Sequence, residues 1–265
     1  MNDLLNLKNK KILITGGLGH LGKFFVKSLI KLGSEVIICD QLSVVKYDIF
    51  LKDIENKFYK KIMYFQCDLS NESSRKILVK KIKLKIKNLD VLINCASLVG
   101  NSNLSGWNTN FENQSVSLWN KVMEINLIAA FDLSKNLKNL LSKNNGGVII
   151  NISSIYGSIA PDMNLYKNTN IYNPAAYSAS KGGLNNLTKW LAVNLAPKIR
   201  VNSISPGGIL RGQSKKFIKN YIKKTPLSRM ANENDIVGAI IFLSSDLSKY
   251  VTGQNLIIDG GFTIH

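Results

Sequence analysis

The sequence predicts one α/β domain over residues 1–265, with helices on both faces of a doubly wound, mostly parallel sheet of seven strands. Its 265 residues, 45% of them hydrophobic, suit one large domain with a layered core. Short apolar runs alternate with longer amphipathic segments along the whole chain. Strands that alternate with helices are joined by crossovers, and crossovers connect parallel strands. No internal repeat or linker-like segment divides the chain.

Each strand is recognised as an apolar run that ends at polar or glycine residues. The seven strands are predicted at 11–15, 35–39, 62–66, 91–93, 146–152, 199–204 and 255–258. The first helix is expected from Lys23 to a stop at Gly33. Further helices are expected at 41–59, at 70–87, around Trp119, Met123 and Asn126, from Tyr177 to Leu195, and at 235–243.

The chain is strongly basic, with 35 Lys and Arg against 17 Asp and Glu and a formal net charge of +18. Such an excess occurs in proteins that bind nucleic acids or membrane surfaces. Here the basic residues are dispersed, and no basic block is interleaved with aromatic residues. The densest run, 80–87, is typical of the end of a surface helix. The charge therefore predicts neither partner, and whether it has a function stays open.

Membrane and metal signals are weak. No apolar run approaches the ~18 residues that span a bilayer, and the segment 1–8 lacks the apolar core of a signal peptide, so we expect a cytoplasmic protein. Cys39, Cys67 and Cys95 are an odd set without a close pair, each at the end of an apolar run. They predict buried, reduced thiols, with no metal site and no disulfide.

A glycine-rich loop follows the first strand and precedes the first helix. Gly17, Gly19 and Gly22 have the G-x-G-x-x-G spacing, which permits a tight turn, close approach to a pyrophosphate and close packing of helix on strand. The helix start that follows supplies N–H groups and a favourable dipole for phosphates. The whole predicted dinucleotide loop is Gly16, Gly17, Gly19, His20, Leu21 and Gly22.

Asp40 ends the second predicted strand, where a carboxylate accepts hydrogen bonds from the ribose diol of a dinucleotide. The same carboxylate repels a 2′-phosphate, and no arginine adjoins it. We therefore expect NAD rather than NADP. The alternative is that Asp40 is only a turn residue.

Tyr177 and Lys181 are four residues apart, so both side chains lie on one face of a helix. A free phenol titrates near pH ~10 and is a poor proton carrier at neutral pH, but a nearby ammonium favours the phenolate. The pair is a candidate for proton transfer. Tyr-x-x-x-Lys also occurs by accident on amphipathic helices, so the interpretation depends on the rest of the chain.

Further short segments complete a pattern. They are Thr15–Gly22, Asp68–Leu69, Asn94–Ser97, Asn126, Ser153–Ser154, Tyr177–Lys181, Pro206–Gly207 and Asp259–Gly261. Together they resemble the short-chain dehydrogenase/reductase family over nearly the whole chain. The resemblance implies a Rossmann domain, a homotetramer or homodimer, and a subunit interface at residues 255–265.

The resemblance also implies roles for individual residues. Tyr177 resembles the family's general acid/base, and Lys181 the residue that lowers its pKa and binds the nicotinamide ribose. Ser154 resembles the serine that hydrogen-bonds the substrate oxygen, and Asn126 the residue that anchors a proton-relay water. Ser153 is expected to be structural, although the sequence leaves an exchange of the two serines open.

Cofactor contacts are implied in the same way. Asp68 and Leu69 would flank the adenine, and Asn94 and Ala96 would line the cofactor groove. Pro206 and Gly207, with Tyr177 and Lys181, would complete the contacts.

Three departures from the family pattern concern the substrate. His20 stands where short members have glycine, and the glycine spacing resembles the longer sugar-nucleotide epimerase and dehydratase branch. Ser97 ends an Asn-Cys-Ala-Ser segment where the family has Asn-Asn-Ala-Gly. Ser154 and Tyr177 are 23 residues apart (177 − 154), a long spacing that creates an insert over about 155–176.

The insert and a lid segment at about 208–226 are the candidate substrate-binding elements. The insert carries tyrosines, Asp162 and Asn173, which suit a sugar or another polyhydroxylated compound, or an ordinary loop that packs its own tyrosines. The lid has an apolar stripe at Phe217 and Tyr221 among five lysines and no acidic residue. A basic lid favours an anionic substrate, but a solvated basic face has the same composition.

We therefore expect an NAD(H)-dependent oxidoreductase that interconverts a secondary alcohol and a ketone on a small molecule. The insert and the glycine loop resemble those of short-chain dehydrogenases in surface-sugar biosynthesis. The alternatives are a 3-oxoacyl-acyl-carrier-protein reductase, whose usual cofactor is NADP, and a catalytically silent NAD-binding sensor. The sequence leaves the substrate, the direction and the oligomeric state open.

Overall fold

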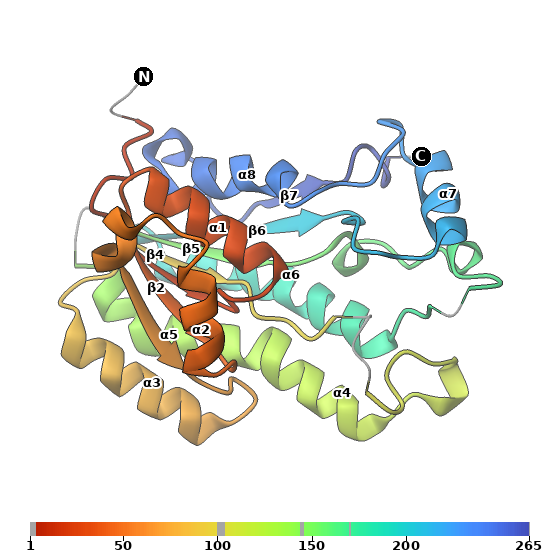
Figure 1. The fold of residues 1–265 in the computed structure, drawn as a ribbon, viewed down its shortest axis with the longest axis horizontal. Helices are drawn as coiled ribbons and strands as arrows, with labels where there is room; N and C mark the ends of the chain where they lie inside the picture. The colour runs from red at the N-terminus through yellow and green to blue at the C-terminus, as the bar shows by residue number, and fades with distance from the viewer. Residues whose placement is uncertain (1–3, 100–103, 144–145, 170, 265) are drawn as a thin grey trace.

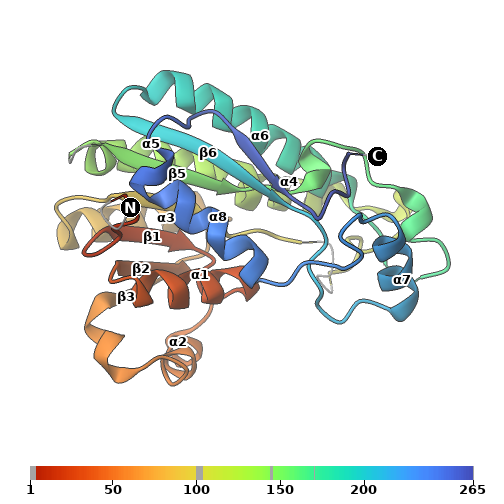
Figure 2. The ribbon, with the colours of Figure 1, turned by 90° about the horizontal axis from the view of Figure 1, so that it is seen from above.

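A seven-stranded parallel sheet in the order β3-β2-β1-β4-β5-β6-β7 forms the centre of the molecule (Figures 1 and 2). The computed structural model describes residues 4–99, 104–143, 146–169 and 171–264. Every strand pair is parallel. The strands are β1 Lys11–Thr15, β2 Glu35–Asp40, β3 Ile62–Gln66, β4 Val91–Asn94, β5 Gly147–Ile152, β6 Ile199–Pro206 and β7 Asn255–Ile258. The predicted doubly wound fold is confirmed.

Two layers of helices cover the sheet. The α-helices are α1 His20–Lys31, α2 Val44–Leu51, α3 Glu72–Lys85, α4 Val116–Met123, α5 Ala129–Leu141, α6 Ala175–Leu195, α7 Lys215–Lys223 and α8 Asn234–Ser244. Helices α1 and α8 pack on one face, and α3, α5 and α6 pack on the other. Among the described residues, no helix combines the length and the low polarity that crossing a membrane requires.

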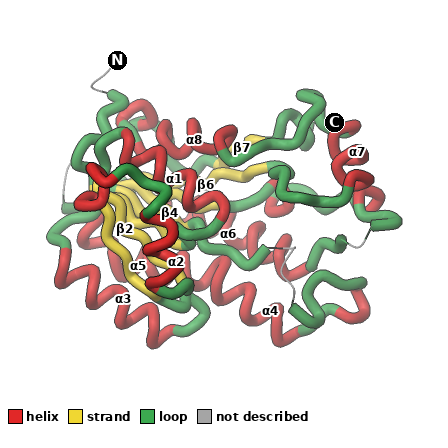
Figure 3. Tube along the Cα trace, viewed as in Figure 1, coloured by secondary structure: helices red, strands yellow, loops and turns green. Residues whose placement is uncertain are grey.

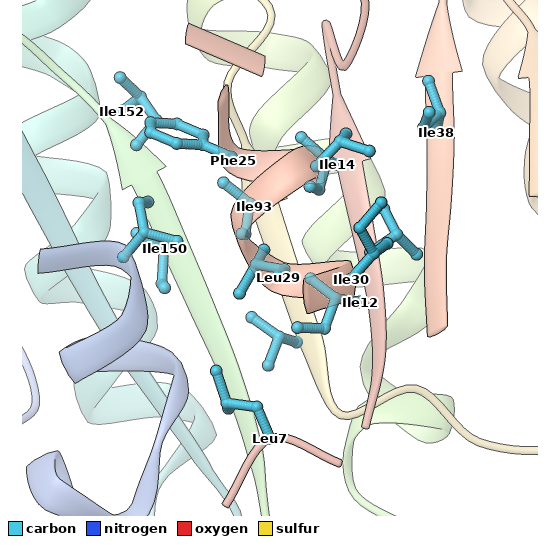
Figure 4. Close-up of a cluster of buried hydrophobic side chains, with 14 of the residues drawn as sticks. Leu7, Ile12, Ile14, Phe25, Leu29, Ile30, Ile38, Ile93, Ile150 and Ile152 are labelled. Carbon is cyan, nitrogen blue, oxygen red and sulfur yellow. The ribbon is translucent and has the colours of Figure 1, made fainter. Parts of the chain in front are cut away.

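The core follows from the alternation of side chains along the strands. In β1, Ile12 and Ile14 face α1 and α8, whereas Leu13 faces α3 and α5. Figure 4 shows the first of these clusters, in which Phe25 and Leu29 of α1 pack on the isoleucines of the central strands. Each fully buried side chain of this size contributes about 1.5–3 kcal/mol, so the two clusters hold both helix layers on the sheet.

A third cluster lies beyond the carboxyl ends of the strands. It joins the insert to the lid helix α7 and consists of Ile155, Leu165, Tyr166, Phe217, Tyr221, Met230 and Phe262. The rings of Tyr221 and Phe262 stack with centroids 4.5 Å apart. Outside the cluster, Lys224 pairs with Asp162 of the insert. The lid is therefore packed on the insert and the carboxyl-terminal segment, on the side of the molecule where the loops gather (Figure 3).

The structure differs from the sequence prediction in two helical regions. The helix expected over 41–59 is two pieces, α2 and a 3₁₀ segment at Asn56–Lys61, and the Tyr59 hydroxyl donates a hydrogen bond to the Leu51 carbonyl between them. The helix around Asn126 contains a π turn at Glu124–Ile128 between α4 and α5. Hydrophobic periodicity predicts neither the break nor the π turn.

Arg75 fixes this π turn to the rest of the fold. Its side chain, only 3% exposed, donates from Nη1 to Glu124 at 3.0 Å and from Nε to Asp132 at 2.8 Å. Nη1 also donates to the Leu69 carbonyl at 2.7 Å. One buried guanidinium therefore connects the loop after β3 to the first residue of the π turn and to α5.

We expect Arg75→Met to lower the free energy of unfolding by about 3 kcal/mol, because removing one member of a buried ion pair leaves its partners without compensation. Arg229→Met is the matched control, since Arg229 makes a bidentate pair with Asp235 on a side chain that is 53% exposed. Its loss should cost less than about 1 kcal/mol. Urea unfolding of both variants measures the difference, and equal losses would contradict the role of Arg75.

Candidate active site

A cavity of about 1100 Å³ opens at the carboxyl ends of the strands. Its lining residues directly follow six strands: Gly16, Gln41, Cys67, Cys95, Ser153 and Gly207. The insert and the lid close the other side. In doubly wound folds ligands bind outside the carboxyl ends of the strands, so the topology predicts the site at this position.

The glycine loop is shaped by contacts that leave no room for side chains. Gly16 has a φ of +65° and donates its N–H to the Cys39 carbonyl at 2.7 Å. A Cβ on Gly22 would collide with the Gly16 carbonyl oxygen. Gly19 precedes α1 without any side-chain cap, so N–H groups at the start of this helix face the cavity rim. The loop thus fits a pyrophosphate, which needs close backbone approach and free N–H donors.

Among the loop residues, the structure separates those on the cavity wall from those behind it. Gly16, Gly19, His20, Leu21 and Gly22 line the cavity. Gly17 is buried, and a Cβ there would meet the Ile38 side chain at 2.8 Å. Gly17 therefore allows the loop to pack on β2.

Asp40 is buried at the end of β2, and its carboxylate lines the same cavity. One oxygen accepts from the Leu18 N–H at 2.9 Å and the other from the Leu42 N–H at 3.1 Å. A carboxylate has about four acceptor sites, so this arrangement orients the group and leaves sites for a diol. The two interpretations of Asp40, turn residue and ribose ligand, are compatible.

The other expected cofactor residues divide in the same way. Asp68, Leu69 and Ala96 line the cavity, as do Pro206 and Gly207. Asn94 lies behind the cavity wall instead, where its amide donates to Asn151 at 2.8 Å. Asn94 is expected from the resemblance to line the groove, but β4 continues through this residue and turns its side chain toward β5.

Asn126 also lies behind the cavity wall, buried in the π turn. Its Oδ1 accepts from the Leu98 N–H at 2.9 Å, and its Nδ2 donates to Ser180 Oγ at 3.0 Å. The side chain therefore ties the loop after β4 to α6. Its role in anchoring a relay water stays a prediction.

Tyr177, Lys181 and Ser154 meet at the end of β5. Tyr177 stands in the first turn of α6, and Ser154 lies close enough to its hydroxyl to lower the pKa of the phenol in part. Lys181, 2% exposed, donates from Nζ to the Ile152 carbonyl at 2.7 Å and lies 5.7 Å from the centroid of the Tyr177 ring. Ser153 faces the helix backbone instead and donates to the Lys181 carbonyl at 3.1 Å. The geometry thus distinguishes the two serines.

The titration of this cluster differs from the sequence expectation. Burial raises the pKa of Tyr177, although the Ser154 hydrogen bond and the Arg211 charge lower it in part. Burial also lowers the pKa of Lys181 to about 8. Lys181 donates its hydrogen bond to the Ile152 carbonyl and is not among the groups that lower the Tyr177 pKa in this structure.

The insert lines the cavity with hydroxyl and amide groups. The hydroxyls of Tyr156 and Tyr166 are 2.8 Å apart, and Asn173 Nδ2 donates to Tyr166 at 3.3 Å. All three residues and Tyr172 border the cavity. Burial raises the pKa of both Tyr156 and Tyr166, so these phenols stay neutral donors and acceptors at physiological pH. Asn170 lies outside the described residues.

The lid presents its apolar stripe, not its lysines, to the cavity. Phe217 and Tyr221 line the cavity, and Tyr221 accepts from the Gly208 N–H at 2.6 Å. The lysines 215, 216, 219, 223 and 224 are exposed, and none borders the cavity. The basic face is therefore solvated. The lid cation that does line the cavity is Arg211, which sequence reasoning did not single out although it is the only arginine in the segment 208–226.

Comparison with known proteins gives consistent results along the whole chain. Residues 20–263 match the family model described as Enoyl-(Acyl carrier protein) reductase. The chain is 32% identical to Post-translational flagellin modification protein A of Campylobacter coli, over 97% of this chain and 99% of the relative. It is 30% identical to 7alpha-hydroxysteroid dehydrogenase of Bacteroides fragilis, over 97% and 96%. It is 28% identical to 5-keto-D-gluconate 5-reductase of Escherichia coli, over 100% and 99%.

Solved structures are similar throughout. A short chain dehydrogenase from Leptospira borgpetersenii with bound NAD⁺ superposes with a TM-score of 0.84 at 39% identity, covering 97% of this chain and 93% of that one. The RhlG/NADP complex of Pseudomonas aeruginosa superposes with a TM-score of 0.85 at 26% identity, covering 99% of each chain. The relatives thus include binders of each dinucleotide.

We expect Ser154→Ala to lower kcat about 100-fold or more while NADH affinity is unchanged, because it removes the hydroxyl beside Tyr177. Ser153→Ala should leave kcat within about threefold of wild type and lower the free energy of unfolding by about 1 kcal/mol, because it loses one hydrogen bond to α6. Steady-state kinetics and urea unfolding separate the two. The opposite pattern would exchange the roles of the serines.

Proposed function

The chain belongs to the short-chain dehydrogenase/reductase family, and on this premise we propose that it interconverts a secondary alcohol and a ketone of a polyhydroxylated metabolite with NAD(H). That it is an oxidoreductase acting on CH–OH groups with NAD or NADP follows from its relatives. The observation that carries the finer proposal is the cluster of Tyr177, Ser154 and Lys181 at the wall of a cavity whose other walls suit a dinucleotide and a polyol.

The protein groups divide the chemistry among them. A bound nicotinamide supplies a hydride acceptor or donor. Tyr177 takes the hydroxyl proton of the alcohol in oxidation and returns it to the carbonyl oxygen in reduction. Ser154 donates a hydrogen bond to the same substrate oxygen, which gains negative charge during reduction. Lys181 is held at the end of β5 by its hydrogen bond to the Ile152 carbonyl, with Nζ 5.7 Å from the centroid of the Tyr177 ring, and would bind the nicotinamide ribose.

We propose NAD as the preferred cofactor because of Asp40. Its carboxylate is held at the cavity wall by the N–H groups of Leu18 and Leu42 and stays available to a 2′-hydroxyl. A 2′-phosphate at the same place would bring two negative charges together. The 39% identical relative from Leptospira borgpetersenii is described with bound NAD⁺, which supports this choice, whereas the more distant Pseudomonas aeruginosa relative is described with NADP.

The substrate proposal rests on the insert. Tyr156, Tyr166 and Asn173 form a hydrogen-bonded wall of polar groups at the cavity, an arrangement that matches the hydroxyls of a sugar or sugar acid. The relative that reduces 5-keto-D-gluconate, by its name, supports this class. We therefore propose a role in carbohydrate biosynthesis. A 3-oxoacyl-acyl-carrier-protein reductase fits less well, since its apolar substrate would leave these groups unpaired.

We further propose a homodimer or homotetramer in the cytoplasm. The edge strand β7 carries Leu256 and Ile257, each more than a third exposed, and Ile264 near the chain end is largely exposed. Exposed apolar side chains at the edge of a sheet favour burial against a second subunit. His265 lies outside the described residues. Three free cysteines suit a reducing compartment.

We expect Tyr177→Phe to lower kcat about 100-fold or more, because the general acid/base is lost while the ring that packs on α6 remains. NADH affinity, measured by fluorescence titration, should change by less than about twofold. Tyr250→Phe is the control, since Tyr250 is fully exposed and does not line the cavity. Turnover is measured on a panel of carbonyl compounds that includes 5-keto-D-gluconate. If Tyr177→Phe reduces any compound of this panel at the wild-type rate, the mechanism is refuted.

Wild-type protein should bind NADH more tightly than NADPH. Asp40→Ala should lower the ratio of NADH affinity to NADPH affinity about tenfold, because it removes the repulsion of the 2′-phosphate. Asp48→Ala is the matched control, because Asp48 is an exposed carboxylate of α2 that does not line the cavity. Fluorescence titration with both cofactors provides the measurement. Equal affinities in the wild type would remove the basis of the NAD assignment.

A further inference from the structure

Arg211 has an arrangement that the reaction described above does not use. It lies between β6 and the lid helix α7, and its side chain lines the cavity while only 18% of it is exposed. Its nearest acidic neighbour is Glu233, with 3.5 Å between Arg211 Nε and Glu233 Oε1. Arg211 Nε is buried and makes no hydrogen bond.

The other three arginines of the chain show what a satisfied guanidinium looks like in this protein. Arg75 donates to two carboxylates and a carbonyl, and Arg229 makes two bonds of 2.6 and 2.8 Å to Asp235. Arg200 donates to the carbonyls of Val251 and Leu243 at 3.1 Å. By contrast, no guanidinium nitrogen of Arg211 donates a hydrogen bond to any described residue.

A guanidinium held in this way lacks hydrogen-bond acceptors. Buried polar groups in proteins are almost always paired, and a charged donor without a partner is costly. Arginine has five donors in a planar fork, which matches the two oxygens of a carboxylate or the oxygens of a phosphate. Glu233 neutralises part of the charge from one side, and the donors remain for an acceptor in the cavity.

The charge of Arg211 also acts at the reacting end of the cavity. Burial raises the pKa of the Tyr177 phenol and of the Cys95 thiol, and the charge of Arg211 offsets part of each rise. The lid lysines point to solvent, so Arg211 is the lid residue through which a positive charge reaches the cavity. The N–H groups at the start of α1, which also lines the cavity, would bind the pyrophosphate of a dinucleotide.

We propose that Arg211 binds an anionic group of the substrate, a carboxylate or a phosphate, and so selects an acidic polyhydroxylated compound over its neutral analogue. This inference rests on the proposed function, whose polar insert wall would hold the hydroxyls. Gln213 supports the position of Arg211, because its Oε1 accepts from the Arg211 N–H at 2.7 Å and its Nε2 donates to the Ile209 carbonyl at 2.7 Å. The side chain is therefore presented from a braced loop.

The test measures binding to the enzyme–NADH complex, in which an alcohol-level ligand cannot react. The probes are gluconate, inorganic phosphate and D-glucitol, and D-glucitol differs from gluconate only by a hydroxymethyl group in place of the carboxylate. Titration calorimetry should show that Arg211→Met weakens the binding of at least one of the two anions about tenfold or more and leaves the binding of D-glucitol unchanged. The anion whose affinity falls identifies the group that Arg211 binds. Equal anion binding by wild type and variant, or no anion binding up to about 100 mM, would overturn the proposal.

Two further measurements make the result specific. Lys216→Met removes one positive charge of the lid at an exposed position outside the cavity, and it should leave the binding of all three probes unchanged. The NADH affinity of Arg211→Met should stay within about twofold of the wild-type value. If the variant loses as much affinity for NADH as for the anions, Arg211 binds the cofactor pyrophosphate and the proposal is overturned. If Arg211→Met does not fold, Arg211→Lys allows the same comparison, with weakening of about threefold or more expected because lysine lacks the fork.

The two proposals fail in different ways. Turnover by Tyr177→Phe at the wild-type rate would refute the reaction mechanism and leave the anion titrations unaffected, because these need no chemistry. Anion binding that does not depend on Arg211 would refute the inference and leave the alcohol–ketone reaction in place.

Discussion

The hydrogen bond from Lys181 Nζ to the Ile152 carbonyl is the contact on which the arrangement of the site depends. It joins the last residue of β5 to a fully buried ammonium of α6, and the Ser153 hydroxyl adds a second bond to the Lys181 carbonyl. Burying a lysine is costly unless its charge is hydrogen-bonded, so α6 has one favourable position on the strand. Tyr177, one turn earlier, is thereby placed beside Ser154 at the cavity wall.

Further buried polar side chains hold the elements around this contact. Asn126 bonds both the loop after β4 and Ser180 of α6, and Arg75 holds the π turn in which Asn126 stands. A chain of buried, hydrogen-bonded polar groups thus connects the loop after β3 with the reacting end of the cavity. Such groups specify one packing arrangement, because any shift leaves charged or amide groups unpaired.

The substrate end is built differently, from aromatic packing and from a cation with unused donors. Tyr166, Phe217, Tyr221 and Phe262 pack the insert on the lid, so the lid is continuous with the cavity wall. In this setting the polar wall of the insert and Arg211 converge on the space beside Tyr177. The proposed reacting groups and the proposed substrate-binding groups therefore line different parts of one cavity.

The fold could be predicted from the sequence because it depends on local patterns: apolar runs for strands and glycine spacing for the loop after β1. The i,i+4 spacing of Tyr177 and Lys181 placed both on one face of a helix, and only the other motifs of the chain made them candidate reacting groups. The sequence also located Asp40 at the end of its strand. Only the tertiary structure decided which serine faces Tyr177, that Asn94 and Asn126 lie behind the cavity wall, and that the lid lysines face solvent while Arg211 faces inward. These depend on which side of a strand end, turn or lid helix packs on distant residues, and local periodicity does not contain that information.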